Sequence, residues 1–500
     1  MKKLREFDLL ESYNEVYDSL RVNTVSRTED NKKVHFKPRN QITAYYNVTD
    51  TSSATRILGA DFDTSQIRYM VVDGVKVYPT YYDETEEQVI EAYNMEEQSY
   101  ATMSLNLDDN DMDYSQHIAS PNEGYGEIMT TMALNNDVET YAGNITPTPD
   151  YDSIDTSLSK YESKGTSYVD TTYKFDSNGE HIITFYFKGG TDGLQALFLN
   201  CKNIFLIDIS KFNGKNITSL SRTFDECQTL QEIKGIGEFD VSNVINMVCP
   251  FQHCYRLKEL PISNWKTNNL EKATYTFNEC YDLKELDLSG WNTDKIEQFE
   301  GCFQYGSYNL ILSNNFCHNC KNLYRLFRYW QGETLNLHNL NTSSAENMGA
   351  MFEECKALTL DLSEFNTINA TDMSKMFNNC KNISNLDLST WNVSNVENFS
   401  EMFKNCLIIE SINGLENFNT SKAINISYMF FYCEKLKKLN ISNWNTSNVK
   451  YFHEFLTNCY SLENIDISKW DTSKGINFQS MFFGCDNMTE INVSNFNTNI

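Results

Sequence analysis

A unit of 25 to 27 residues recurs through the C-terminal three-fifths of the chain, and no other feature limits the fold as strongly. All fourteen cysteines lie in this part. Ten of them keep the register, apart from one gap of 75 residues that holds two more units, and these ten are Cys201, Cys227, Cys254, Cys280, Cys355, Cys380, Cys406, Cys433, Cys459 and Cys485. A fixed period of roughly 20 to 50 residues is typical of solenoids, whose stacked units share a core. The spacing therefore predicts about twelve stacked units.

Large side chains form a second ladder with the same period. One follows each strand-like run, at Phe212, Phe239, Trp265, Trp291, Phe316, Leu340, Phe365, Trp391, Phe418, Trp444, Trp470 and Phe496. Inside the gap of the cysteine ladder, Gly306 and Trp330 occupy the cysteine position. Because the two ladders agree in period and phase, we expect these aromatic residues and the in-register cysteines to be rungs of the core.

The unit that ends at Cys406 illustrates the expected local structure. Its segment "LDLS" (386–389) alternates apolar and polar residues, as a strand with one buried face does. After a turn, Phe399, Met402, Phe403 and Cys406 follow at i, i+3, i+4 and i+7, which predicts one face of a short helix. The expected fold class is therefore α+β: a small N-terminal β domain followed by a solenoid of about twelve strand-plus-helix units.

The pattern "LDLSxWNTSNVxxFxxMFxxCxxL", found at 386–407 and 439–462, resembles the units of BspA-like leucine-rich-repeat surface proteins of bacteria. The resemblance extends over about residues 200–500. It implies a leucine-rich-repeat solenoid that acts in adhesion or recognition and has no catalytic activity.

The charge of the chain limits its partners. The formal net charge is −27, whereas contacts with nucleic acid phosphates require an excess of Lys and Arg. Nucleic acid and anionic membrane surfaces are therefore not expected partners. The N-terminal segment has no apolar core of a secretory signal, and no run is long enough to insert in a membrane. We expect the chain to be made and folded in a cytoplasm, with reduced cysteines.

The first two-fifths of the chain predict a different architecture. Strand-like runs occur in 42–82, with Asp73-Gly74 as a hairpin turn, and in 171–188 around Asn178-Gly179. The segment 83–165 separates them and contains nineteen Asp or Glu against two Lys. We interpret the runs as one β domain with an acidic insert, which is either mobile or packed as an extension.

Three parts are thus predicted: an N-terminal docking segment (1–41), a β-sandwich-like domain (42–190) and the solenoid (191–500). A β module directly before such repeats is similar to those of tail and surface proteins of gut bacteria and their phages. The segment "NTVSRTEDNKKVHFKP" (23–38) also resembles the leader of some phage virion proteins.

No metal or other cofactor is assigned, but two groups of residues come nearest to a metal site. A C-x-x-C pair with a further thiol and a histidine one unit on could hold zinc, at Cys302, Cys317, Cys320 and His338, but a single such pair is weak evidence, and local packing or a chance pair is the favoured interpretation. Alternating acids could hold calcium, at Asp109, Asp111 and Asp113. Tyr114 and Ser120 stand where an EF-hand loop has Gly and Glu, which favours a solvated acidic loop.

Polar residues at the outward strand positions form a candidate binding face. They are Asp287, Asn336, Asp361, Asp387, Asn440, Asp466 and Asn492, with a row of serines beside them. One interpretation is a hydrogen-bonded ladder that satisfies the exposed face. The other is a concave surface for a glycan or a protein, as solenoids often provide.

No set of residues combines a nucleophile, a base and oxyanion donors, so we expect no enzyme. The favoured function is a phage virion protein, a tail fibre or another appendage, assembled in the host cytoplasm. Residues 1–190 would bind other virion proteins, and the repeats would bind a host-surface glycan or protein. The alternatives are a BspA-like adhesin on a bacterial cell surface and an intracellular scaffold. The missing export signal favours the virion, and a homo-oligomer is left open.

Overall fold

The computed structural model describes residues 41–77, 80–82, 87–88, 93–94, 127–128, 167–168, 171–187 and 191–496. The chain divides into two compact units, Met1–Gly189 and Gly190–Ile500. The predicted docking segment 1–41, apart from its last residue, and most of the acidic segment 83–165 lie outside the described residues.

An antiparallel sheet forms the centre of the first unit. Neighbouring strands pair in the order β1 (Gln41–Val48), β11 (Gly179–Phe187), β3 (Ile67–Val72), β4 (Val75–Val77) and β7 (Tyr93–Asn94). Alternate residues of β1 and β11 are buried over most of their length, as in Ile183 and Phe185 of β11. Strands from both sides of the acidic segment therefore pair in one sheet, β1 with β11.

The sequence predicts two hairpin turns in this unit, and the structure contains one of them. Asp73 and Gly74 have φ values of 46° and 89° and close the predicted hairpin between β3 and β4. The hairpin predicted at Asn178-Gly179 is wrong, because β10 (Thr172–Lys174) pairs with β2 (Thr55–Arg56) and β8 (Glu127–Ile128) and not with β11. The remaining elements are η1 (Thr64–Gln66) and a sheet of β6 (Glu87–Gln88), β5 (Thr80–Tyr82) and β9 (Ser167–Tyr168).

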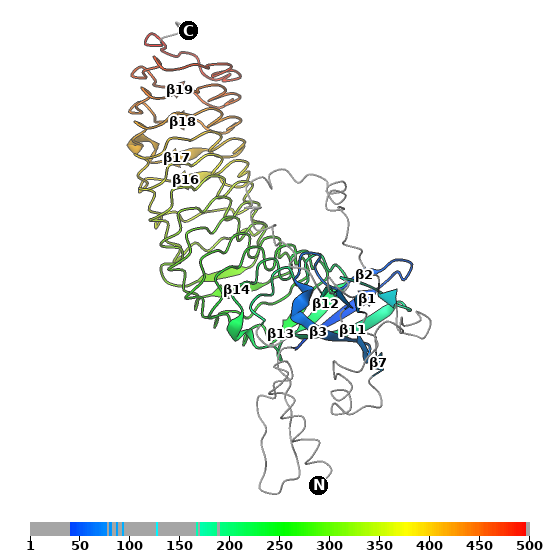
Figure 1. Cartoon of the computed structure of the whole chain (residues 1–500). Coiled ribbons are helices and arrows are strands. Elements are labelled where there is room, and N and C mark those ends of the chain that lie inside the picture. The colour runs from blue at the N-terminus through cyan, green and yellow to red at the C-terminus, as the bar shows by residue number, and fades with distance from the viewer. Residues whose placement is uncertain are drawn as a thin grey trace, which may run out of the picture. The chain divides into compact units, whose positions relative to one another are not determined.

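The second unit is a solenoid of stacked coils (Figure 1). One residue per coil forms a parallel bridge to the next coil, in an unbroken series through Gly193, Ser219, Asn246, Lys272, Gln298, Asn322, Asn347, Asp372, Asn398, Asn425, Tyr451 and Asn477. These twelve bridge residues agree with the predicted number of units. No helix among the described residues has the length and apolarity that crossing a membrane requires.

Several coils also contain a short strand, and these strands pair in parallel. The pairs are β12 (Ile204–Asp208) with β13 (Glu232–Lys234), β14 (Glu285–Leu288) with β15 (Asn309–Leu312), β16 (Asn385–Asp387) with β17 (Ser411–Asn413), and β18 (Lys438–Leu439) with β19 (Asn464–Ile465). Two 3-10 turns, η5 (Gly214–Asn216) and η6 (Leu415–Asn417), complete the regular elements of this unit.

The predicted helix of each unit is absent, so the α+β class and the strand-plus-helix unit are wrong: the described solenoid is a β-solenoid. The segment from Phe399 to Cys406 shows why. Glu401 and Asn405 have φ values of 59° and 57°, in the left-handed region that no right-handed helix contains. Alternate N–H groups donate to the next coil, such as Phe399 N–H to Asn425 O over 2.9 Å. The spacing identified the buried residues correctly but not their backbone.

Core rungs stack in columns along the solenoid. The phenylalanine rings from Phe198 to Phe455 follow one another with centroid distances of 5.3 to 6.2 Å. Eight of the ten in-register thiols donate to a backbone carbonyl of the preceding coil over 3.0 to 3.2 Å, as Cys406 does to Phe377 O. Burial raises the pKa of the Cys406 thiol to about 12. These eight thiols therefore act as hydrogen-bond donors between coils, and all of them except Cys485 are buried.

Candidate binding groove

The predicted binding face has a role within its own coils. Six of its seven side chains accept the backbone N–H two residues further on, over 2.9 to 3.1 Å, namely Asp287, Asn336, Asp361, Asp387, Asp466 and Asn492. Hydrogen bonds from the hydroxyl and backbone N–H of Ser389 lower the pKa of Asp387, and the same arrangement recurs at Asp361 and Asp466. These side chains close Asx turns, which explains their recurrence without a ligand. Asn440 is exposed on the same row.

The structure does not join the four zinc candidates in one site. Cys302, Cys317 and Cys320 are buried, whereas the His338 side chain is 69% exposed and lies 3.6 Å from the carboxylate of Glu364. Burial raises the pKa of both Cys302 and Cys317. Across the described residues, no three His, Cys, Asp or Glu side chains meet as a metal site would require. The calcium candidates Asp109, Asp111 and Asp113 lie outside those residues.

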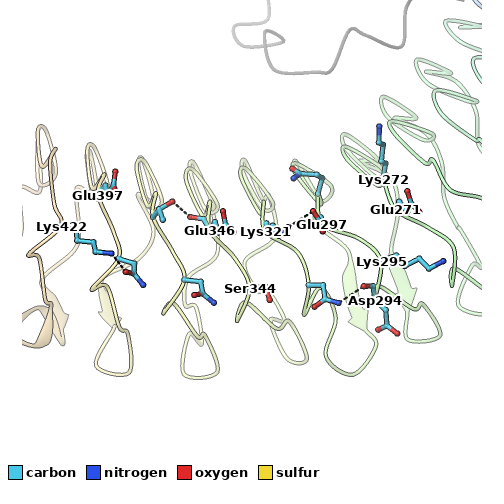
Figure 2. A pocket seen from close by; sticks show the side chains of 15 residues that line it. Glu271, Lys272, Asp294, Lys295, Glu297, Lys321, Ser344, Glu346, Glu397 and Lys422 are labelled. Carbon is cyan, nitrogen blue, oxygen red and sulfur yellow. Dashed lines mark hydrogen bonds and ion pairs between the residues drawn. The ribbon is translucent and has the colours of Figure 1, made fainter.

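A polar groove runs along seven successive coils on another side of the solenoid (Figure 2). Its volume is about 900 Å³. The side chains that line it are Glu271, Lys272, Asp294, Lys295, Glu297, Gln298, Asn319, Lys321, Ser344, Glu346, Asn369, Thr371, Asn395, Glu397 and Lys422. None of them belongs to the predicted binding face. The groove is the candidate functional site of the solenoid.

Coil-to-coil hydrogen bonds fix the backbone beneath the groove. The carbonyl of Glu346 accepts the N–H groups of Thr371 and Asp372 over 2.8 and 3.2 Å. The carbonyl of Glu397 accepts those of Ile424 and Asn425 over the same two distances. The glutamate backbone is therefore held by the next coil, while the carboxylates are exposed.

Asparagines form a row beside these glutamates. The Nδ2 groups of Asn319, Asn369 and Asn395 donate to backbone carbonyls of the preceding coil over 2.7 to 2.8 Å. An amide that donates through nitrogen keeps its oxygen as an acceptor. The Oδ1 of Asn395, for example, accepts a hydrogen bond from Lys422 Nζ over 2.7 Å. The row thus presents amide oxygens at the spacing of the coils.

The charges of the groove nearly balance, with five carboxylates against four lysines. One direct ion pair joins Lys321 Nζ to Glu297 over 3.0 Å. The carboxylates of Glu346 and Glu397 are exposed, and neither has an ion pair or hydrogen bond within the described part of the chain. These two carboxylates are therefore available acceptors.

A smaller hollow of about 410 Å³ adjoins the groove and shares Asp294 with it. Its lining consists mainly of hydroxyl and amide side chains, including Ser313, Asn314 and Asn341. Here the repeat is irregular: Asn315 and Cys317 have φ values of 56° and 65°. Across this hollow His318 Nε2 lies 3.7 Å from Asp294 Oδ1.

Sequence reasoning missed both the groove and the hollow. Apart from Asp294, the groove residues occupy the variable positions of "SNVxxF" and the position before its valine, which hold Glu, Lys, Asn, Gln, Ser or Thr in different coils. A search for recurring residues passes over positions that vary. The signal available in the sequence was their consistent polarity between two apolar rungs.

Comparisons with known proteins identify a family of the solenoid. The family model described as "Mycoplasma protein of unknown function, DUF285" matches residues 192–315, 321–411 and 409–500. These three stretches coincide with the solenoid and cover more than half of the chain. No curated protein and no solved structure matches.

Proposed function

The chain belongs to the DUF285 family, and from this premise we propose that it is a non-enzymatic recognition protein whose solenoid binds molecules on a cell surface. The observation that carries the proposal is the groove along seven coils. A solenoid is a stiff stack, and its long faces are suited to extended ligands. The resemblance to BspA-like leucine-rich-repeat surface proteins points to the same role.

The chemistry of the groove favours binding over catalysis. Its lining contains carboxylates, amines, amides and hydroxyls, but no histidine or cysteine. These groups form hydrogen bonds over a long, open surface, whereas catalysis requires a few groups that converge on one reacting atom. Adhesion or host recognition needs only the former.

We place the protein on a phage virion, with residues 1–190 attached to other virion proteins and the repeats directed at the host. The resemblance of segment 23–38 to virion leaders and of the β module to phage tail proteins supports this placement. A bacterial cell-surface adhesin is the second candidate, because the BspA-like repeat motif by itself favours it. Mass spectrometry of purified phage particles and of washed cell surfaces from the same culture distinguishes the two.

Recognition is tested with the full chain and a panel of bacterial strains. We expect the chain to bind cells of at least one strain, and the double variant Glu346→Ala, Glu397→Ala to bind at least about tenfold more weakly, because two exposed acceptors are lost. The matched control is Glu416→Ala, Glu463→Ala, which removes two exposed carboxylates outside the groove. Binding to no strain, or equal loss in both double variants, contradicts the proposal.

A further inference from the structure

We infer that the ligand of the groove is an extended, neutral glycan of a bacterial surface, and that the adjoining hollow holds one end or branch of it. This inference rests on the proposed recognition function and names its ligand class. It follows from the polar side chains of the lining, from the near balance of charges and from the hydrogen bonds that already occupy the backbone of the groove.

The lining excludes ligands that bind through apolar contact. None of the fifteen side chains along the groove is aromatic or a large aliphatic. A peptide anchored by side chains requires apolar pockets, and an apolar small molecule requires an apolar wall. Hydroxyl groups, in contrast, both donate and accept, so they can bond with carboxylates, amide oxygens and ammonium groups alike.

Charge argues against a polyelectrolyte. Lysines and carboxylates are interspersed along the groove: Lys295 precedes Glu297, and Lys321 is paired with Glu297 across the coils. A polyanion would meet the carboxylates of Glu346 and Glu397, and a polycation would meet Lys272 and Lys295. A neutral polymer would not be repelled by either set of charges.

The backbone leaves no edge for an added peptide strand. From Glu297 to Glu397, the carbonyl at this position of each coil already accepts two N–H groups of the next coil, as at Glu346 with Thr371 and Asp372. Binding by strand addition needs a row of unpaired N–H and C=O groups. The groove thus offers side-chain acceptors and donors at every coil, which suits a polymer with hydroxyls at regular intervals.

The hollow supplies a second polar position next to this row. Amide and hydroxyl side chains such as Asn314, Asn341 and Ser343 surround it, and Asp294, which lies 3.7 Å from His318, also lines the groove. Asn314 is exposed, and no other described side chain bonds to its amide. Its amide can therefore donate to one hydroxyl of a sugar ring and accept from another.

The test uses the full chain in affinity electrophoresis through gels that contain one polymer each. The neutral polymers are dextran, yeast mannan, galactomannan and laminarin, and the charged ones are heparin and poly-lysine. We expect at least one neutral polymer to retard the chain, with less than about a threefold change in affinity between about 0.05 and 0.5 M NaCl, because neutral hydrogen bonding is weakly screened. Glu346→Ala, Glu397→Ala and the hollow variant Asn314→Ala should each weaken binding by about fivefold or more.

Conservative variants separate a neutral ligand from a cationic one. The double variant Glu346→Gln, Glu397→Gln keeps the two acceptors, so its affinity for a neutral polymer should stay within about threefold of the parent's. If the ligand were a polycation, this variant would lose as much affinity as the alanine variant does. Retardation by heparin or poly-lysine alone, or by no polymer, overturns the inference. Cell binding that survives periodate oxidation of the cells but is lost after protease treatment also overturns it, while leaving the recognition function intact. Binding to no cells at all would remove the recognition function itself.

Discussion

Trp391 and Trp444 are both buried in the core of the solenoid, but their indole N–H groups differ in their polar contacts. Replacing each with phenylalanine isolates the effect of that difference on stability. Trp444 Nε1 donates to Leu415 O over 2.8 Å, whereas Trp391 Nε1 is buried and has no hydrogen-bond partner among the described residues. Phenylalanine suits the position, because Phe365 and Phe418 occupy it in the preceding coils. The loss of side-chain volume is common to both substitutions and cancels in the comparison.

The remaining difference can be estimated from the contacts. Trp444→Phe removes one hydrogen bond worth about 1 kcal/mol, and Leu415 O keeps its second donor, Phe418 N–H. Trp391→Phe removes a buried donor without a partner, whose desolvation costs about 1 kcal/mol or more. We therefore expect Trp444→Phe to be more destabilising than Trp391→Phe by about 2 kcal/mol.

Hydrogen exchange with peptide-level mass spectrometry measures this difference in each coil. The peptides that cover 386–406 and 439–459 report the local opening free energy of the two coils, and neighbouring coils should respond next because repeat stability depends on adjacent units. Equal destabilisation by the two substitutions, or a larger effect of Trp391→Phe, would refute the assignment of the polar contacts.

Three further predictions concern the thiols, the turns and pH. In native thiol labelling the buried cysteines should stay unmodified, and Cys485, the one that is only partly buried, should react first; rapid labelling of all fourteen contradicts the packing. Asn405→Gly should be neutral or stabilising and Asn405→Ala should cost about 1 kcal/mol in urea unfolding, the reverse of the order in a helix. Burial opposes the charged imidazole of His253, but hydrogen bonds and charges of Asp225 and Glu279 outweigh it and raise the pKa from 6.5 to about 9. The contribution of His253 to the free energy of unfolding is thus complete below pH 6.5 and is lost as pH rises through about 9. Urea unfolding across this pH range should show the loss in the parent and not in His253→Gln.

The rungs of the core could be predicted because burial repeats with the coil. Trp444, Phe403 and Cys406 recur at one period, and a side chain needed in every coil leaves a regular trace in the sequence. The backbone between the rungs could not be predicted in the same way. Apolar residues at i, i+3, i+4 and i+7 fit a helix, but they also fit successive tight turns whose corners, such as Glu401 and Asn405, are left-handed. Neither corner is a glycine, so composition gave no warning.

The candidate site was harder to predict than the core. Asp387 and its counterparts recur because each closes an Asx turn, and recurrence drew attention to them. Glu346 and Glu397 are separated by a threonine in the intervening coil, and only the stacking of the coils places all three along one groove. Residues that act together through such stacking leave no fixed spacing pattern of one residue type.

The location of the binding surface is tested most directly by hydroxyl-radical footprinting of the full chain with and without a bacterial surface extract that it binds. We expect protection along the groove, at Glu346 and Glu397 and at its four lysines Lys272, Lys295, Lys321 and Lys422, with unchanged reactivity along the row of Asp387 and Asp466. Protection along that row with an unprotected groove would contradict the assignment of recognition to the groove.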